Sequence, residues 1–256
     1  MKINALFFSP TGGTKQVLDI LCPVWDCEKT YIDLCSLDTD ISFDPTDACM
    51  IAVPSFGGRV PKFLISKLKR IHGNGAKTVL VAVYGNRAYE DTLLELKDAA
   101  EASDLSCFGA AAAIARHSII PKYGAGRPDD SDIRELQRFS ARCRDILEKG
   151  SLPATYSLAL PGNRPYRPYA TLPLAPSAGK NCSGCGLCAE RCPVGAIPAD
   201  NPQRCNKETC ISCMQCVSLC PEKARRVNPA ILKAAELKLK KVCSERKANE
   251  FFLPAI

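Results

Sequence analysis

The feature that most constrains this chain is a cysteine motif that occurs twice in its C-terminal third. Residues 182–193 read Cys-Ser-Gly-Cys-Gly-Leu-Cys-Ala-Glu-Arg-Cys-Pro, and residues 210–221 read Cys-Ile-Ser-Cys-Met-Gln-Cys-Val-Ser-Leu-Cys-Pro. Both copies follow the spacing C-x2-C-x2-C-x3-C-P, and corresponding cysteines lie 28 residues apart (210 − 182). The fold of this segment must therefore bring eight thiols together in two similar loops, which indicates metal ligation.

The spacing is that of the bacterial run that binds two [4Fe-4S] clusters. Two-residue gaps wrap a short loop around one cluster and bring three thiolates to three irons, while the fourth cysteine reaches the other cluster. One predicted ligand set is Cys182, Cys185, Cys188 and Cys220, and the other is Cys210, Cys213, Cys216 and Cys192. Structural zinc is the alternative, but it usually uses two C-x2-C pairs or cysteine with histidine. Cys205, just before the second motif, is interpreted as a packed loop thiol.

The chain has 16 cysteines and no apolar run near the roughly 18 residues of a membrane helix. The apolar stretch at residues 5–8 is too short for a signal-peptide core. We therefore expect no membrane span and a cytoplasmic location, where thiols stay reduced and can bind metal.

Charge is distributed unevenly along the chain. Residues 1–160 hold 19 Lys and Arg against 20 Asp and Glu, whereas residues 161–256 hold 15 against 7. Two oxidised clusters would subtract about four charges from the formal total. We therefore expect the C-terminal part to dock redox partner proteins through an acidic face of the partner, and we expect no nucleic-acid binding.

Residues 1–150 alternate apolar runs with helical patterns, which is typical of βαβ units around a parallel sheet. The expected strands are residues 3–8, 29–34, 48–54, 78–84 and 106–114, and the expected helices are residues 14–21, 61–71, 89–102 and 130–149. This pattern predicts an α/β fold with a doubly wound, five-stranded parallel sheet, whose ligands bind at the carboxyl ends of the strands.

The remaining chain divides into three parts. Residues 151–180 contain six prolines, which disfavour helix and sheet interior and predict a Pro-rich linker. Residues 181–228 hold the cysteine module, and residues 229–256 are expected to form a C-terminal helix, over residues 229–250, and a tail.

Three loops follow expected strands at the edge where ligands should bind. The first joins hydroxyl groups and glycines at a strand-to-helix turn, a combination that suits a phosphate. The other two add aromatic rings, glycines and polar groups that suit a flat heterocycle, so the set predicts a mononucleotide such as FMN. The candidate residues are Ser9, Thr11, Gly12, Gly13 and Thr14 in the first loop, Pro54, Ser55, Phe56, Gly57 and Gly58 in the second, and Tyr84, Gly85, Asn86 and Arg87 in the third.

These motifs resemble a known family. The Ser-Pro-Thr-Gly-Gly-Thr turn at residues 9–14 resembles the FMN-phosphate loop of flavodoxins, although Gly13 replaces the usual Asn and Pro10 removes a backbone donor. With the linker sequence Pro-Gly-Asn-Arg-Pro-Tyr and the terminal Asn-Glu-Phe-Phe-Leu, the whole chain resembles the flavodoxin–ferredoxin fusions called ferrodoxins, which are expected mainly in anaerobes. The resemblance implies a flavodoxin-like FMN-binding domain over residues 1–150, a small α+β two-[4Fe-4S] ferredoxin domain over residues 181–228, and FMN contacts by the three loops.

The function predicted from these features is electron transfer between FMN, two [4Fe-4S] clusters and a partner, without catalytic residues of its own. Two alternatives remain open: a flavin-dependent reductase of a small acceptor, and an iron–sulfur module that senses oxygen or redox state. Arg59 and Arg87 are candidates to neutralise the phosphate or the reduced flavin, or else solvated charges. His117 is a candidate neighbour of the flavin.

Overall fold

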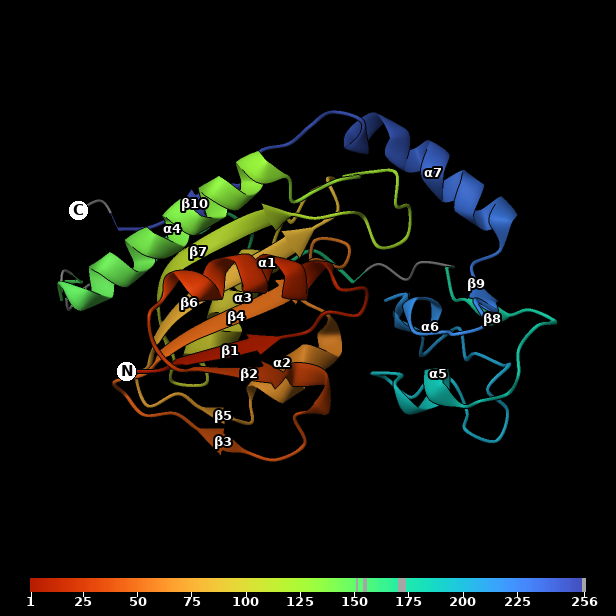
Figure 1. The fold of residues 1–256 in the computed structure, drawn as a ribbon, viewed down its shortest axis with the longest axis horizontal. Coiled ribbons are helices and arrows are strands. Elements are labelled where there is room, and N and C mark those ends of the chain that lie inside the picture. Colours follow the sequence, from red (N-terminus) through yellow and green to blue (C-terminus); the bar gives the residue numbers. More distant parts are fainter. Residues whose placement is uncertain (151, 154–155, 170–173, 255–256) are drawn as a thin grey trace.

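The computed structural model describes residues 1–150, 152–153, 156–169 and 174–254, and Figure 1 shows its ribbon. Its centre is a six-stranded sheet with the order β10-β7-β6-β4-β1-β2. Five strands run parallel: β1 (Ile3–Phe7), β2 (Lys29–Asp33), β4 (Ala48–Pro54), β6 (Lys77–Tyr84) and β7 (Ser106–Ile114). Their order in the sheet, second-first-third-fourth-fifth, is that of the flavodoxin-like doubly wound fold. The predicted fold class is confirmed.

Four helices cover the two faces of this sheet (Figure 1). Helices α1 (Gly13–Leu21) and α4 (Asp130–Glu148) contact each other and share one hydrophobic cluster with alternate strand residues. Helices α2 (Lys62–Leu68) and α3 (Thr92–Glu101) lie in the other cluster. In β4, for example, Met50 and Ala52 belong to the first cluster and Cys49 and Ile51 to the second. A strand buried on both faces in this way reads as a continuous apolar run.

The sixth strand differs from the prediction of five. β10 (Glu250–Phe252) comes from the C-terminal tail and pairs antiparallel with β7, where Phe251 lies opposite Ala111. The chain thus returns to the N-terminal sheet after the cysteine module, and β10 covers what would otherwise be the free edge of β7. Covering an edge in this way removes a template for pairing with other chains.

Several element boundaries also differ from the prediction. The third helix begins at Thr92 rather than at residue 89, because Glu90 has a positive φ value of 43° that a helix does not allow. The second helix ends at Leu68, and Ile71 instead pairs with Ile41 in a small parallel sheet. That sheet joins β3 (Ile41–Ser42) and β5 (Ile71–His72). Short 3-10 turns follow α1 at Cys22–Val24 and β2 at Leu34–Ser36.

The cysteine module has little regular structure. It contains the four-residue helices α5 (Leu187–Glu190) and α6 (Gln215–Ser218) and the strand β9 (Arg225–Arg226). Strand β9 pairs antiparallel with β8 (Ser177–Ala178), which lies at the end of the predicted linker. The C-terminal helix α7 (Pro229–Cys243) follows, with the Asn228 side chain accepting from Ala230 N at its start. It ends at Cys243, whereas the predicted helix extended to residue 250. None of the helices among the described residues is long and apolar enough to cross a membrane.

Residues 163–167 of the predicted linker are bonded to helix α3 and to Asp91 at its start. The buried Asp91 carboxylate accepts hydrogen bonds from Asn163 N at 2.9 Å and from Arg167 N at 2.7 Å. Arg164 pairs with Asp98 at 2.6 Å. Prolines keep this segment extended, and its polar groups find partners on the helix instead of within a ladder. Residues 151, 154–155 and 170–173 of the predicted linker, which include Pro173, lie outside the described residues.

Candidate functional site

The two cysteine loops have the same backbone conformation. Left-handed φ values recur at offsets of 28 residues, at Gly184, Gly186 and Gly195 in the first copy and at Ser212, Met214 and Lys223 in the second. Helices α5 and α6 likewise begin 28 residues apart (215 − 187). Glycine adopts this conformation without a steric cost, whereas a side chain there costs roughly 1 kcal/mol. The second loop therefore keeps a shape that its own residues do not favour, as a conserved binding geometry requires.

Backbone N–H groups point at the sulfurs of these loops. Ala196 N donates to Cys192 Sγ at 3.2 Å, and Ala224 N donates to Cys220 Sγ at 3.3 Å, which is the same contact in each repeat. Ser212 N donates to Cys210 Sγ at 3.4 Å. Such N–H···S bonds stabilise thiolates and are one of the means by which proteins tune iron–sulfur clusters.

The second predicted ligand set lines one cavity. Its wall includes Cys192, Cys210, Cys213 and Cys216 together with Cys205, Met214 and other apolar side chains. Burial, together with the neighbouring thiols of Cys216, Cys192 and Cys210, raises the pKa of Cys213 to about 12. Four thiols from both repeats around one apolar cavity fit the donor set of an iron–sulfur cluster.

Cys205 also belongs to this cavity wall, which the interpretation as a packed loop thiol did not include. Burial, together with the nearby Cys210, raises its pKa to about 12. Its position close to the second motif was the only sequence signal for this contact.

The first predicted ligand set is more open. Cys185 is exposed, and Cys182, Cys188 and Cys220 are half-buried. Burial raises the pKa of Cys220, but backbone N–H groups of Arg225, Ala224 and Glu222 outweigh that effect and leave the pKa lowered. Among the described residues, no three His, Cys, Asp or Glu side chains form a site for a single metal ion.

The predicted phosphate loop lies between β1 and α1. Gly12 has a φ of 90°, and a side chain there would extend into open space. The Ser9 hydroxyl accepts from Lys15 N at 2.9 Å, which caps the helix and leaves the hydroxyl proton free to donate. The N–H groups of Gly13 and Thr14 begin the helix and have no partner within it, so they fit an anion. Lys15 turns away from the loop to Asp19 and the ring of Tyr31.

The second loop forms a tight turn after β4. Phe56 and Arg59 exchange backbone hydrogen bonds of 2.9 and 3.2 Å across Gly57 and Gly58, whose φ values are 62° and 83°. Two left-handed residues at the centre of a two-residue turn are the geometry for which glycine is preferred. Pro54 ends β4, and the Ser55 hydroxyl lies 2.8 Å from that of Thr92.

The third loop faces the C-terminal segment. Asn86 Nδ2 donates to Cys243 O and Glu245 O, both at 2.8 Å, and the Tyr84 hydroxyl donates to Ala248 O at 3.4 Å. Arg87 is bonded to Glu90. These side chains are engaged within the protein, so only the backbone of this loop is left for the predicted contact with a ring. Gly85 keeps that backbone close to His117, since a Cβ at Gly85 would lie 2.7 Å from His117 Cα.

Arg59 is committed to the protein rather than to a ligand. Its guanidinium pairs with Glu95 at 2.7 Å and lies 4.1 Å from the Tyr169 ring centre and 4.9 Å from that of Tyr166. The Glu95 hydrogen bond raises the pKa of Arg59 despite its burial. Neither predicted role, phosphate neutralisation or a solvated charge, matches this position.

His117 lies in the loop after β7 and is neutral at physiological pH. Burial, together with the charge of Arg87, lowers its pKa to about 4. His117 Nδ1 accepts from Ile119 N at 3.1 Å and from Ile120 N at 3.2 Å. The proton of the neutral ring therefore lies on Nε2.

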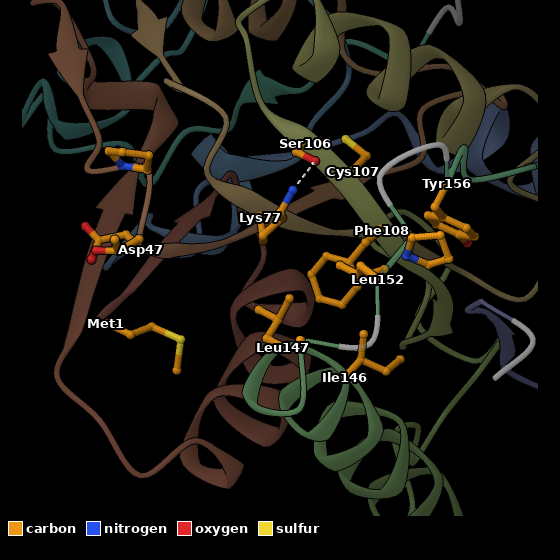
Figure 2. A pocket seen from close by; sticks show the side chains of 14 residues that line it. Met1, Asp47, Lys77, Ser106, Cys107, Phe108, Ile146, Leu147, Leu152 and Tyr156 are labelled. Atoms are coloured by element: carbon orange, nitrogen blue, oxygen red, sulfur yellow. Dashed lines mark hydrogen bonds between the residues drawn. The ribbon is translucent and has the colours of Figure 1, made fainter.

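Figure 2 shows a separate cavity of about 370 Å³ at the opposite edge of the sheet. Its wall includes Lys77 and Ser106, the first residues of β6 and β7, whose side chains are joined at 3.0 Å. This is the amino edge of the strands, so the cavity is distinct from the three predicted loops.

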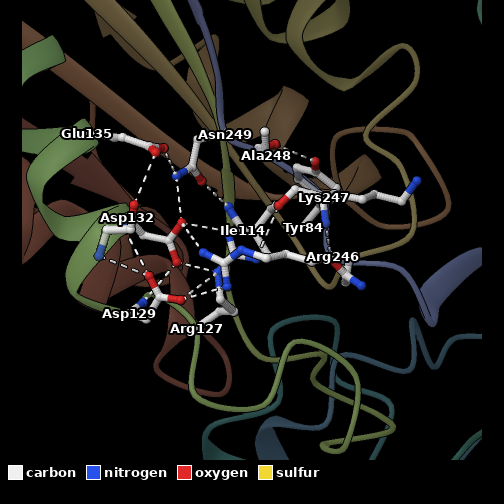
Figure 3. A network of polar contacts seen from close by, with 12 residues as sticks. Tyr84, Ile114, Arg127, Asp129, Asp132, Glu135, Arg246, Lys247, Ala248 and Asn249 are labelled. Atoms are coloured by element: carbon white, nitrogen blue, oxygen red, sulfur yellow. Dashed lines mark hydrogen bonds and ion pairs between the residues drawn. The ribbon is translucent and has the colours of Figure 1, made fainter.

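A polar network fixes the segment between α7 and β10 (Figure 3). Asn249 accepts from Ile114 N at 3.0 Å and donates to Asp132 at 2.9 Å and Glu135 at 3.0 Å. The buried Arg127 binds Asp132 and donates to Lys247 O at 3.2 Å. The module is thus attached to the N-terminal domain on both sides, by the linker on α3 and by this segment on α4.

Comparisons with known proteins give one family match, in the cysteine module, and several similar solved structures that cover a little more than half of the chain. Residues 180–197 and 206–226 match the family model of the 4Fe-4S binding domain. No curated protein matches the chain. Similar solved structures include a flavodoxin from the domain Archaea, at 14% identity and a TM-score of 0.42 over 59% of this chain and 100% of the other. Flavodoxin 1 from Bacillus cereus is 15% identical, with a TM-score of 0.43 over 57% of this chain and 98% of the other. Rubredoxin oxygen:oxidoreductase from the anaerobe Desulfovibrio gigas is 10% identical, with a TM-score of 0.44 over 59% of this chain and 37% of the other.

The order of the five parallel strands and the match of both cysteine repeats identify the two parts of the molecule. The chain joins an N-terminal domain of flavodoxin-like fold to a C-terminal 4Fe-4S binding domain, which is the architecture of a flavodoxin–ferredoxin fusion.

Proposed function

We propose that this protein is an electron carrier that relays electrons between FMN and two [4Fe-4S] clusters and exchanges them with a redox partner protein. In this proposal the loop at residues 9–14 binds the FMN phosphate, and the loops at residues 54–58 and 84–87 border the ring. Cys182, Cys185, Cys188 and Cys220 bind one cluster, and Cys210, Cys213, Cys216 and Cys192 bind the other.

One observation carries the proposal: the second cysteine loop packs on the carboxyl edge of the sheet. Cys213 and Ile211 belong to the same hydrophobic cluster as Phe8, which precedes the first ligand loop, and Phe56, which lies in the second. Burial raises the pKa of Cys35, in the turn after β2, and among the charges that raise it further is Cys192. A predicted cluster ligand therefore lies near the N-terminal domain at the edge where the fold binds its ligands.

The chain's own residues provide position and environment rather than acid–base chemistry. FMN can exchange one or two electrons and thereby connects the one-electron chemistry of clusters with two-electron chemistry. The Gly57–Gly58 turn keeps the second loop compact, and the close contact of Gly85 with His117 fixes the backbone of the third loop where the proposal places the ring. The neutral His117 can donate only from Nε2, and it adds no positive charge at this edge.

The partner is proposed to present an acidic face to the cysteine module and α7. The last turn of α7 carries Lys240 and Lys241, and Lys233 and Lys238 extend the basic surface along the same helix. Leu237 and Val242 are exposed on the same helix. None of the 16 cysteines forms a disulfide, which supports a location in the reducing cytoplasm.

An anaerobic reductive titration tests the proposal, with flavin followed by absorbance and the clusters by electron paramagnetic resonance. We expect about four electrons per chain, two for FMN and one for each cluster, taken up and returned reversibly. Clusters that do not cycle would contradict the relay and favour a sensing role. Rapid turnover of a small acceptor without any protein partner would favour the reductase instead.

A further inference from the structure

The second cysteine repeat contains a buried cation that the first repeat lacks. Arg225, in β9, is only 2% exposed, and the residue 28 positions earlier is the buried Ile197. No carboxylate oxygen of the described residues lies within 4.0 Å of the Arg225 guanidinium, since none of their ion pairs includes it. A buried charge without an opposite charge is strongly unfavourable. Arg225 therefore needs an anion that the described part of the polypeptide does not provide.

Backbone carbonyls accept hydrogen bonds from only two of the three guanidinium nitrogens of Arg225. Nη1 donates to Pro176 O at 3.0 Å, and Nη2 donates to Pro202 O at 2.6 Å and to Arg204 O at 2.9 Å. Nε has no partner. Among the described residues, only Arg225 Nε and Gln215 Oε1 are buried side-chain nitrogen or oxygen atoms without a hydrogen bond. Both atoms lie in the cysteine module, where a bound group is expected.

Arg225 also lies close to both predicted ligand sets. Pro202 O, which accepts from Arg225, lies 3.8 Å from the Sγ of Cys188 in the first set. On the other side, strand β9, which contains Arg225, packs against helix α6, which contains Cys216 of the second set. The guanidinium is thus positioned between thiols of the two sets.

We propose that Arg225 is the shared counter-ion of the two clusters and raises their reduction potentials. The proposal rests on the proposed function. Reduction adds one electron to a cluster that already carries net negative charge with its four thiolates, and it forms or breaks no bond at Arg225. Guanidinium keeps its proton in proteins. Its fixed positive charge therefore favours the reduced form, and local charge is one of the quantities that set cluster potentials.

The internal repeat predicts which cluster responds more strongly. Ile197 lines the cavity of the second ligand set. By the 28-residue correspondence, Arg225 occupies the equivalent wall of the first set, in agreement with its contact to Pro202 beside Cys188. When the positive charge of Arg225 is removed, the reduction potential of the cluster bound through Cys188 should therefore fall by more than that of the other cluster.

The test is a mediated electrochemical titration of the whole chain under anaerobic conditions, with the spin signals of both clusters recorded. Arg225→Met should lower the more affected midpoint potential by at least about 59 mV, which is a tenfold change in a one-electron equilibrium. Arg225→Lys keeps the positive charge, so its midpoint potential should lie close to that of the wild type. Arg226→Met is the matched control, because Arg226 is the exposed next residue of the same strand and carries the same charge. It should leave both potentials unchanged.

An Arg225→Met protein with full iron content and unchanged potentials would overturn the inference. If Arg225→Met does not retain iron, Arg225→Gln replaces it, because glutamine keeps a hydrogen-bond donor without the charge. Iron retained only by Arg225→Lys would support the counter-ion role, whereas loss of iron in all three variants would show a structural role and refute it. Absence of iron from the wild-type protein would instead contradict the proposed function.

Discussion

At the scale of single residues, burial decides which charged groups the N-terminal domain offers to a ligand. Arg59 follows a glycine turn at the predicted site, and its sequence position suggested an anion-binding role. Its actual partners are Glu95, Tyr166 and Tyr169, two of which come from the linker far along the chain. No local pattern could have indicated that packing.

His117 leads to a prediction about pH. Its pKa is lowered from 6.5 to about 4 in the folded chain. Below pH 6.5 the unfolded chain binds a proton that the folded chain does not, so the folded state loses stability as the pH falls toward 4. We expect the stability of wild type relative to His117→Gln to decrease by about 2 kcal/mol between pH 7.5 and pH 5.

Denaturant unfolding of both proteins at the two pH values measures this change, and their difference cancels effects common to both. The control is His72→Gln, because the His72 side chain is 60% exposed. An equal pH response of His117→Gln and wild type would refute the neutral buried state of His117.

At the scale of elements, the sequence predicted those with strong local patterns. The five parallel strands and the helices between them were predicted because apolar runs and helical periodicity are local properties. The strand β10 was missed, because three residues after a helical pattern carry no signal of their own. Its formation depends on β7 and on contacts such as that of Asn249 with Ile114 N. The ligand sets follow from spacing, whereas Arg225 lies outside the motif and became evident only from burial.

The segment before β10 gives a prediction about stability. Asn249→Ala removes the partner of Ile114 N and two donors to the carboxylates of Asp132 and Glu135. Leaving these buried groups unsatisfied should destabilise the protein by about 2–3 kcal/mol. The exposed Asn201→Ala, the control, should change the unfolding free energy by less than about 0.5 kcal/mol. Equal unfolding midpoints for Asn249→Ala and wild type would mean that β10 is not held by this network.

The cysteine loops give a second prediction at this scale. Gly195 and Lys223 occupy equivalent left-handed positions, with φ values of 62° and 48°. Gly195→Ala should lower the stability of the module by about 1 kcal/mol, whereas Lys223→Gly should leave it unchanged or raise it by up to about 1 kcal/mol. Thermal bleaching of the cluster absorbance under anaerobic conditions measures both. A harmless Gly195→Ala would show that the two loops do not share one backbone geometry.

At the scale of the whole molecule, the cysteine module is attached to the N-terminal domain at two places, one before it and one after it in the sequence. The linker binds α3 through Asp91, and the C-terminal segment binds α4 through Asp132. Helix α7 packs between them, with Leu232 and Ala235 in contact with both the loop after β7 and the module. Two attachments restrict the position of the module relative to the carboxyl edge of the sheet, as a relay between fixed cofactors requires.

The uneven charge predicts how partners associate. Electron exchange with an acidic partner should slow as ionic strength rises, because salt screens the attraction that steers encounter. Replacing both Lys240 and Lys241 by Glu should slow it further, whereas Lys62→Glu and Lys69→Glu on the N-terminal domain should have little effect. Stopped-flow rates at several salt concentrations measure this. Rates independent of salt would argue against a basic docking face.

The most direct test of the central claim is the composition of the protein purified without oxygen. Iron, sulfide and flavin should be measured together on the same sample. The account predicts about eight irons, about eight sulfides and about one FMN per chain. Colourless protein, or protein that contains zinc in place of iron, would contradict it.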